Sequence, residues 1–167
     1  MKIIYIWNKL LRKKSENIEN FSTKELSNLI DFLKEELKKS NGVGIAAPQF
    51  GLNKNIFIIH SFPNKRYPYA PEFGPIEIIN PEILETCDEM ETWWEGCLSI
   101  PWKRWLVKRY KKIKVRYFDK NGKEYVKYFE WFIARIFQHE YDHLQWILFV
   151  DKVDKIYTEE EFLKMID

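Results

Sequence analysis

A single stretch near the end of the chain, WFIARIFQHEYDHLQ (131–145), limits most strongly the folds that are open to it. The stretch has the character of a helix and is apolar on nearly every side until its histidines. A helix of this kind is usually buried at the centre of a domain, because no face of it prefers water. We therefore predict a helix over 131–145 with the other elements packed around it.

The predicted helix places His139 and His143 on one face, because residues four apart are neighbours on a helix surface. Glu140 is rotated from His139 by about 100° around the axis and lies beside that face. This arrangement is typical of metallohydrolases: two histidines hold a metal, the metal acidifies a water molecule and the glutamate takes its proton. Asp142 is a candidate for orienting one histidine. Histidines that are merely hydrogen-bonded inside a core are the less favoured alternative.

A catalytic metal site needs a third protein ligand and one open position. The residues alone leave three candidates. The glutamates at 159–161 lie downstream, as in thermolysin-like proteases, and His60 lies upstream in a predicted strand. Cys97 lies in WEGCLSIP, where we expect an irregular segment with backbone freedom at Gly96 and strand pairing interrupted by Pro101. A free cysteine is otherwise most often a small buried apolar residue.

A second helix is predicted over 22–40, where leucines and isoleucines keep one face apolar. Ser22 and Glu25 match the pattern of a capping box, and Asn41-Gly42 is typical of a helix end. The segment that follows, GVGIAAPQFG (42–51), is rich in Gly, Ala and Pro. We expect it to be a loop.

Strands are predicted at 55–60, 76–79, 113–117 and 124–129. The proline-rich segment 61–75 is expected to be an irregular excursion, and Asn121-Gly122 predicts a hairpin turn between the last two strands. The basic segment 103–116 could also be an RNA-binding strip. That reading is less favoured, because the net charge of the chain is only +2.

The chain is expected to form one domain over residues 1–167. Its 46% hydrophobic and 31% charged residues are ordinary for a soluble globular protein. Cys87 and Cys97 are too few for a disulfide framework, so a reducing cytoplasm is the expected location. The N-terminus lacks the apolar length and the cleavage site of a signal peptide, and we expect no membrane span.

Three motifs, GVGIAAPQ (42–49), EGCLSIP (95–101) and QHEYDHL (138–144), occur in this order in the chain. With these motifs and separations the chain resembles peptide deformylases over nearly its whole length. The resemblance implies an α+β fold in which antiparallel strands pack around a central metal-binding helix. It also implies that Cys97 joins His139 and His143 as metal ligands, so that the downstream glutamates belong to an ordinary helix. Members of the family remove the N-formyl group from the starting methionine of new bacterial proteins.

The resemblance implies further roles around the metal. Glu140 would act as general base and would then return the proton to the departing amine. The side-chain amide of Gln49 and the backbone N–H of Leu98 would stabilise the oxyanion. Fe(2+) is the expected metal in bacteria, with Zn(2+), Ni(2+) or Co(2+) as replacements. Because Glu140 and Gln49 are both present, a catalytically inactive binding module is disfavoured.

The residues expected to bind the peptide are Val43, Gly44, Ile45, Arg104, Phe132 and Ile136. The first three lie in the glycine-flanked loop and can expose main-chain groups for strand-like pairing. The two helix residues lie three and seven positions before His139 and, with Val43, are predicted to wall an apolar pocket for methionine. Plain core positions are an equal alternative for these two. Arg104 matches a family position near the peptide groove.

Formyl-methionyl nascent peptides are therefore the expected partners. We expect no membrane contact and no direct nucleic-acid binding. Docking to the ribosome has weak support, because the tail after Val150 is short and acidic.

Tryptophan and glycine depart from their usual frequencies. The chain has seven Trp and only six Gly, against an average glycine content of about 7%. Only Trp94 stands where the family commonly has tryptophan. The resemblance implies glycine at the other positions, which are Trp7, Trp93, Trp102, Trp105, Trp131 and Trp146. We hypothesise that these codons are UGA, read as glycine in the source organism and rendered as tryptophan in this sequence.

Overall fold

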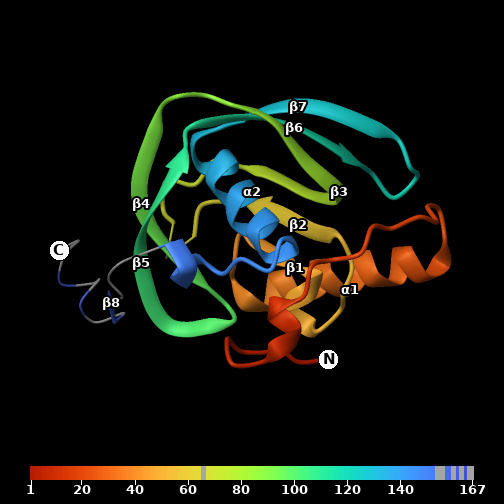
Figure 1. The fold of residues 1–167 in the computed structure, drawn as a ribbon, viewed down its shortest axis with the longest axis horizontal. Coiled ribbons are helices and arrows are strands. Elements are labelled where there is room, and N and C mark those ends of the chain that lie inside the picture. Colours follow the sequence, from red (N-terminus) through yellow and green to blue (C-terminus); the bar gives the residue numbers. More distant parts are fainter. Residues whose placement is uncertain (65–66, 153–156, 159–160, 162–163, 165–167) are drawn as a thin grey trace.

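The computed structural model describes residues 1–64, 67–152, 157–158, 161 and 164. Its two longer helices are α1 (Lys24–Ser40) and α2 (Trp131–Leu144). Short 3-10 turns are η1 (Lys9–Arg12), η2 (Ala47–Phe50) and η3 (Phe149–Lys152). In Figure 1, α2 runs through the middle of the molecule with strands around it. The helix predicted over 131–145 is confirmed, and so is its central position.

A five-stranded antiparallel sheet in the order β1-β2-β3-β6-β7 forms the larger part of the fold. Its strands are β1 (Gly44–Ala46), β2 (Ile56–Ser61), β3 (Phe73–Thr86), β6 (Lys112–Phe118) and β7 (Glu124–Glu130). All four predicted strands are present, although β3 is much longer than expected. The turn between β6 and β7 contains Gly122 at φ 79°, as the hairpin prediction requires.

A long hairpin forms the second sheet. It consists of β4 (Met90–Cys97) and β5 (Ile100–Tyr110), with β8 (Tyr157–Thr158) paired to the outer edge of β5. The expectation that Pro101 interrupts the strand pairing was wrong, because the ladder includes the pair Cys97–Ile100 and β5 runs through Pro101. The register does shift between Glu95 and Cys97, at Gly96, where backbone freedom was expected. Pro101 lies near the start of β5, where a missing N–H is tolerated.

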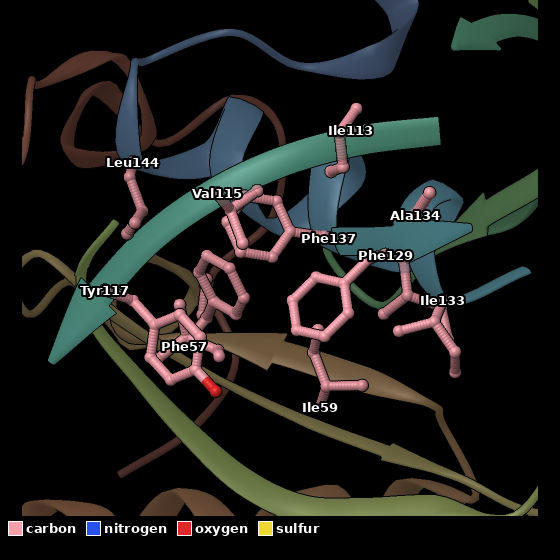
Figure 2. Packing of buried hydrophobic residues seen from close by; sticks show 13 residues of the cluster. Phe57, Ile59, Ile113, Val115, Tyr117, Phe129, Ile133, Ala134, Phe137 and Leu144 are labelled. Atoms are coloured by element: carbon pink, nitrogen blue, oxygen red, sulfur yellow. The ribbon is translucent and has the colours of Figure 1, made fainter. Parts of the chain in front are cut away.

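The strand β2 separates two apolar layers because its side chains alternate between the faces of the sheet. Phe57 and Ile59 point into the cluster that contains α2, and Figure 2 shows both beside Phe137 and Phe129. The neighbouring residues Ile56 and Ile58 pack in a second cluster with the apolar face of α1. The two helices therefore cover opposite faces of the same sheet, and α2 lies on the inner side between the two sheets.

The start of α1 differs from the prediction. Thr23 is the N-cap, and its side chain accepts a hydrogen bond from the backbone N–H of Leu26 at 3.1 Å. Ser22 precedes the cap and has φ 58°, so it does not form the predicted capping box. The helix ends as predicted at Asn41, which adopts the left-handed conformation with φ 52°.

The segment 42–51 is more regular than the predicted loop. It contains β1 and the turn η2, and β1 pairs with β2 through its inner edge. Within the described residues, β1 is an edge strand of its sheet. Local composition did not reveal this, because the pairing partner β2 begins only after the turn.

The fold class is α+β with antiparallel sheets around a central helix, as the sequence predicted. Within the basic segment 103–116, the side chains of Arg104 and Arg109 are buried, so these two cannot contribute to an RNA-binding strip. Among the described residues, no helix has the length and apolar character needed to cross a membrane.

Candidate metal centre

Three side chains that can bind a metal ion converge beside α2. One ligand atom each from Cys97, His139 and His143 lies within 4.8 Å of the others. Cys97 and His143 are buried, and the side chain of His139 is 11% exposed. The Sγ atom of Cys97 lies 3.3 Å from Nε2 of His143. The geometry therefore brings together the three residues that the sequence resemblance selected.

Two elements place these ligands. Cys97 is the last residue of β4, and the tight turn into β5 carries it against α2. His139 and His143 are one helical turn apart on α2, with ring centroids separated by 5.3 Å. A thiolate with two imidazoles is a donor set that suits zinc and also Fe(2+).

The other candidates for the third ligand do not join this cluster. Among the described residues, neither His60 nor Glu161 belongs to the group. Glu161 and Thr158 instead exchange backbone-to-side-chain hydrogen bonds of 2.6 and 3.1 Å, the pattern of a capping box. The glutamates at 159–160 lie outside the described residues.

Glu95 was not predicted, and it fixes the orientation of His139. Its Oε2 lies 2.9 Å from Nδ1 of His139, which leaves Nε2 of that ring for a metal. Arg109 donates two hydrogen bonds to Glu95, through Nε at 3.0 Å and Nη2 at 2.9 Å. Arg135 donates a third at 2.8 Å. The motif EGC contains this glutamate, but its partner is 44 residues away, so no local pattern indicates the contact.

Asp142 does not orient a histidine. It accepts a hydrogen bond from Arg109 at 2.5 Å and another from Lys152 at 2.8 Å. Because Arg109 also binds Glu95, the hydrogen bonds of Asp142 connect it to His139 through Arg109 and Glu95. The expectation that Asp142 contacts a ligating histidine was therefore wrong.

The buried charges set the protonation of the two histidines. Burial alone would raise the pKa of Glu95, but the charge of Arg109 and the hydrogen bond from His139 lower it below its usual range. Burial would lower the pKa of His139, yet its hydrogen bonds to Cys97 and Glu95 raise it well above the usual value. The pKa of His143 is lowered well below its usual value by burial and by the charge of His139. His143 is thus neutral, as a ligand must be.

Glu140 faces the same site without a hydrogen-bond partner. It is 5% exposed, and among the described residues nothing pairs with its Oε2. Burial raises the pKa of Glu140 to about 7. Its carboxylate packs against the α-carbon of Gly44, where a β-carbon would lie 2.5 Å from Oε1. A buried carboxylate with one free oxygen and such a pKa is suited to accept and return a proton near neutral pH.

Gln49 is held with its amide directed toward Cys97. Its Oε1 accepts a hydrogen bond from the backbone N–H of Ala46 at 2.9 Å, which fixes which end of the amide is free. Its Nε2 lies 3.6 Å from Sγ of Cys97 and 3.4 Å from Oγ of Ser99. Leu98 follows the cysteine in the hairpin turn and lies in the wall of the adjoining cavity.

The cavity beside the ligands is lined by residues from the segments 42–49, 95–98 and 135–140 and by Tyr67. Val43, Gly44 and Ile136 lie in its wall, where the sequence placed them. Ile45 does not, because its side chain is fully buried in the cluster beneath α1. Only its main chain is available to a ligand.

Two other predicted residues lie one layer behind the cavity. Tyr67 covers Phe132, with ring centroids 5.1 Å apart, and Tyr67 itself lines the cavity. The guanidinium of Arg104 lies against the α-carbon of Gly96, so closely that a β-carbon there would collide with Nη1. Gly96 therefore provides space for Arg104 and not only backbone freedom.

Comparisons with known proteins agree with this geometry. The family model described as polypeptide deformylase matches residues 1–159. The chain is 44% identical to peptide deformylase 2 of Nostoc sp. over 98% of this chain and 93% of that protein. The crystal structure of a class I type b peptide deformylase from Acinetobacter baumannii with bound Met-Ala-Ser superimposes with a TM-score of 0.90. That match has 39% identity and covers 92% of this chain and 98% of the other.

A more distant structure gives the same result. Peptide deformylase 1B of Arabidopsis thaliana has 33% identity and a TM-score of 0.82, over 99% of this chain and 86% of that chain. The sequence matches and the similarity of fold both show that the chain belongs to the polypeptide deformylase family.

Proposed function

We propose that this protein is a metal-dependent hydrolase that removes the N-formyl group from the N-terminal formyl-methionine of newly synthesised proteins. The observation that carries the proposal is the convergence of Cys97, His139 and His143 beside the unpaired carboxylate oxygen of Glu140. The whole chain, 1–167, would act as one catalytic domain.

Cys97 as thiolate, with His139 and His143 as imidazoles, would hold one divalent ion. Binding of the ion would displace the proton that the raised pKa of His139 favours. A bound ion would supply Lewis acidity, which polarises the formyl oxygen and lowers the pKa of water at the site. Fe(2+) is the physiological ion that we propose, and Zn(2+), Ni(2+) or Co(2+) could replace it in the same donor set. Glu95 would keep the ring of His139 in the ligating orientation, because it holds Nδ1.

Glu140 would carry the proton. Its free Oε2 would accept a proton from the attacking water and then deliver it to the nitrogen of the departing amine. The C–N bond of the formamide breaks, and formate and a free N-terminus result. Burial of this carboxylate raises its pKa to about 7, which suits proton transfer near neutral pH.

Gln49 and Leu98 would stabilise the oxyanion. The amide of Gln49 already faces the ligand Cys97, and the backbone N–H of Leu98 follows that residue directly. In other hydrolases each such donor lowers the barrier by about 3–4 kcal/mol. The contact of Gln49 with Cys97 and the place of Leu98 in the cavity wall support this role.

The peptide would bind along the free edge of β1. Main-chain groups at Val43, Gly44 and Ile45 can pair with an extended chain, because β1 is an edge strand among the described residues. The relative from Acinetobacter baumannii has the peptide Met-Ala-Ser bound, which is consistent with a product of this kind. Ile136 would contact the methionine side chain. Arg104 would contribute to peptide binding indirectly, because its guanidinium packs against Gly96 in the cavity wall.

The proposed partners are nascent formyl-methionyl chains in the cytoplasm.

Formate release from formyl-Met-Ala-Ser by anaerobically prepared, metal-loaded protein tests the activity. We expect release by the wild-type protein and its loss after chelation. Cys97→Ala should lose stoichiometric metal, while the matched control Cys87→Ala should keep it. A Cys97→Ala variant that retains one equivalent of metal would favour instead a zinc protease with a downstream glutamate as ligand.

A further inference from the structure

Among the residues that the structure describes, Tyr67 is the one in the cavity wall that comes from neither the three sequence motifs nor α2. The other lining residues all lie in 42–49, 95–98 and 135–140. Tyr67 belongs to the segment between β2 and β3, which the sequence reading treated only as a surface excursion. A residue from a separate segment that completes the wall can determine the size of the cavity.

The residue of α2 that Tyr67 contacts shows which end of the cavity the tyrosine closes. Its ring contacts Phe132, which lies seven residues before the ligand His139. At about 1.5 Å per residue, Phe132 lies roughly 10 Å along the axis from that histidine. Ile136 lies between them in the cavity wall. Tyr67 therefore lies at the end of the cavity that is remote from the metal ligands.

The backbone of Tyr67 is held in place by Asn64. The N–H of Tyr67 donates to the backbone oxygen of Asn64 at 3.1 Å and to its side-chain Oδ1 at 2.9 Å. The N–H of Asn64 donates back to Tyr67 at 3.1 Å. In a fourth hydrogen bond, the N–H of Ala70 donates to the carbonyl oxygen of Tyr67 at 3.2 Å. The tyrosine is thus a fixed part of the wall.

Apart from the proton-carrying Glu140, the charges of Arg135 and Glu95 in this wall are paired with each other. Arg135 donates to Glu95 at 2.8 Å and to the carbonyl oxygens of Val107 and Glu91 at 2.9 and 2.8 Å. Because Arg135 and Glu95 already bind each other, we expect the cavity to select a substrate side chain by its shape and its apolar contacts.

We propose that Tyr67 determines specificity for the first side chain of the substrate. Its ring closes the far end of the pocket and covers Phe132, so that an unbranched side chain of the length of methionine fits and a bulky aromatic one is excluded. This inference rests on the proposed deformylase function. The sequence assigned Phe132 to the wall of the pocket, whereas we assign the limit on pocket length to Tyr67, which covers Phe132.

The test compares kcat/KM for formyl-Met-Ala-Ser and formyl-Phe-Ala-Ser within each variant. The ratio of the two values does not depend on metal loading or on the active fraction. Tyr67→Ala and the more conservative Tyr67→Leu should shift the ratio toward the phenylalanine peptide by at least about tenfold, since even one methylene more or less in an apolar pocket is worth about 10–200-fold. Tyr67→Phe should keep the wild-type ratio, because the ring remains.

Tyr69→Ala is the matched control, because Tyr69 lies two residues away and is 97% exposed. Its ratio should equal that of the wild type. An unchanged ratio in both Tyr67→Ala and Tyr67→Leu, in proteins that still release formate, would overturn the inference alone. Wild-type protein that releases formate from neither peptide would remove the proposed function and the inference with it.

Discussion

Gly44 shows how much a single missing side chain contributes to this site. A β-carbon at this position would lie 2.5 Å from Oε1 of Glu140 and 2.8 Å from its Cγ. Real contacts of this kind are not tolerated, so the glutamate would have to move. The sequence reading assigned Gly44 to peptide binding, and the structure adds a second reason for glycine there.

We expect Gly44→Ala to lower kcat by at least about tenfold while metal content stays stoichiometric, because general-base catalysis contributes about 10²–10⁴-fold and depends on geometry. If Gly44 acts through Glu140, the double variant with Glu140→Ala should be no slower than Glu140→Ala alone. Additive losses in steady-state kinetics would show that the glycine acts by another route.

Two of the unexpected tryptophans have a backbone conformation that favours glycine. Trp131 and Trp146 have φ 51° and 55°, at the start of α2 and shortly after its end. Such conformations cost non-glycine residues about 1–3 kcal/mol. Lys111 and Lys14 lie over the two rings at 5.0 and 5.9 Å, but an exposed cation–π contact returns only about 0.5–1 kcal/mol. The balance favours glycine at both positions.

Trp131→Gly and Trp146→Gly should therefore each raise the free energy of unfolding by about 1 kcal/mol, measured by urea titration. Trp94→Gly is the control and should destabilise, because Trp94 lies in β4 and glycine weakens a strand. UGG codons at Trp131 and Trp146 in the gene would end the hypothesis of UGA-encoded glycine.

The strain argument does not extend to Trp105. This residue lies in β5 and is fully buried, and among the described residues its Nε1 has no hydrogen-bond partner. Its ring centroid is 3.8 Å from that of Phe149, closer than the 4.5–7 Å usual for aromatic pairs. The indole is crowded, but its removal from this packed cluster would leave a cavity, so we predict no gain in stability there.

At the scale of elements, the start of α1 gives a measurable contrast between neighbouring residues. Thr23→Ala should lower the free energy of unfolding by about 1 kcal/mol, the usual value for a lost N-cap. Ser22→Ala should have a much smaller effect, because the side chain of Ser22 does not cap the helix. Equal losses in thermal or urea unfolding would contradict the observed cap.

Elements whose burial follows a simple period were predictable. The stretch around Ile136 and Phe137 is apolar all round, and Ile113, Val115 and Tyr117 alternate with basic residues. The hairpin β4–β5 was not predictable in this way. Its buried charges, such as Arg109, have partners on α2 and on the opposite strand, so they look like surface residues in the sequence.

The same reason limited the prediction of the site. Cys97, His139 and His143 lie in recognisable motifs, and their convergence was foreseen. The contacts of Glu95 and Tyr67 depend on which segments meet in space, and a single sequence does not encode that locally.

At the scale of the whole molecule, an ion pair joins the N-terminal segment to the segment after α2. Arg12 in η1 donates to Asp151 in η3 through two nitrogens, with Nη2 at 2.9 Å from Oδ1. The hydrogen bond from Arg12 lowers the pKa of Asp151 below its usual value. The pair is partly exposed, so its contribution should stay below about 1 kcal/mol.

This contribution has a defined pH dependence. A carboxylate with a lowered folded pKa stabilises the protein above its unfolded pKa of about 3.9 and loses that effect as pH falls through the folded value. Asp151→Asn should therefore be less stable than wild type at pH 6, and the difference should shrink by pH 3. A difference in unfolding free energy that stays constant between these values would contradict the assignment.

The central claim is that Glu140 carries the proton at a metal site built by Cys97, His139 and His143. The most direct test is formate release from formyl-Met-Ala-Ser by metal-loaded Glu140→Ala, with metal content measured on the same sample. We expect one equivalent of metal and a rate at least about two orders of magnitude below wild type, because the general base alone is lost. Near-normal turnover, or loss of the metal together with the activity, would contradict the account.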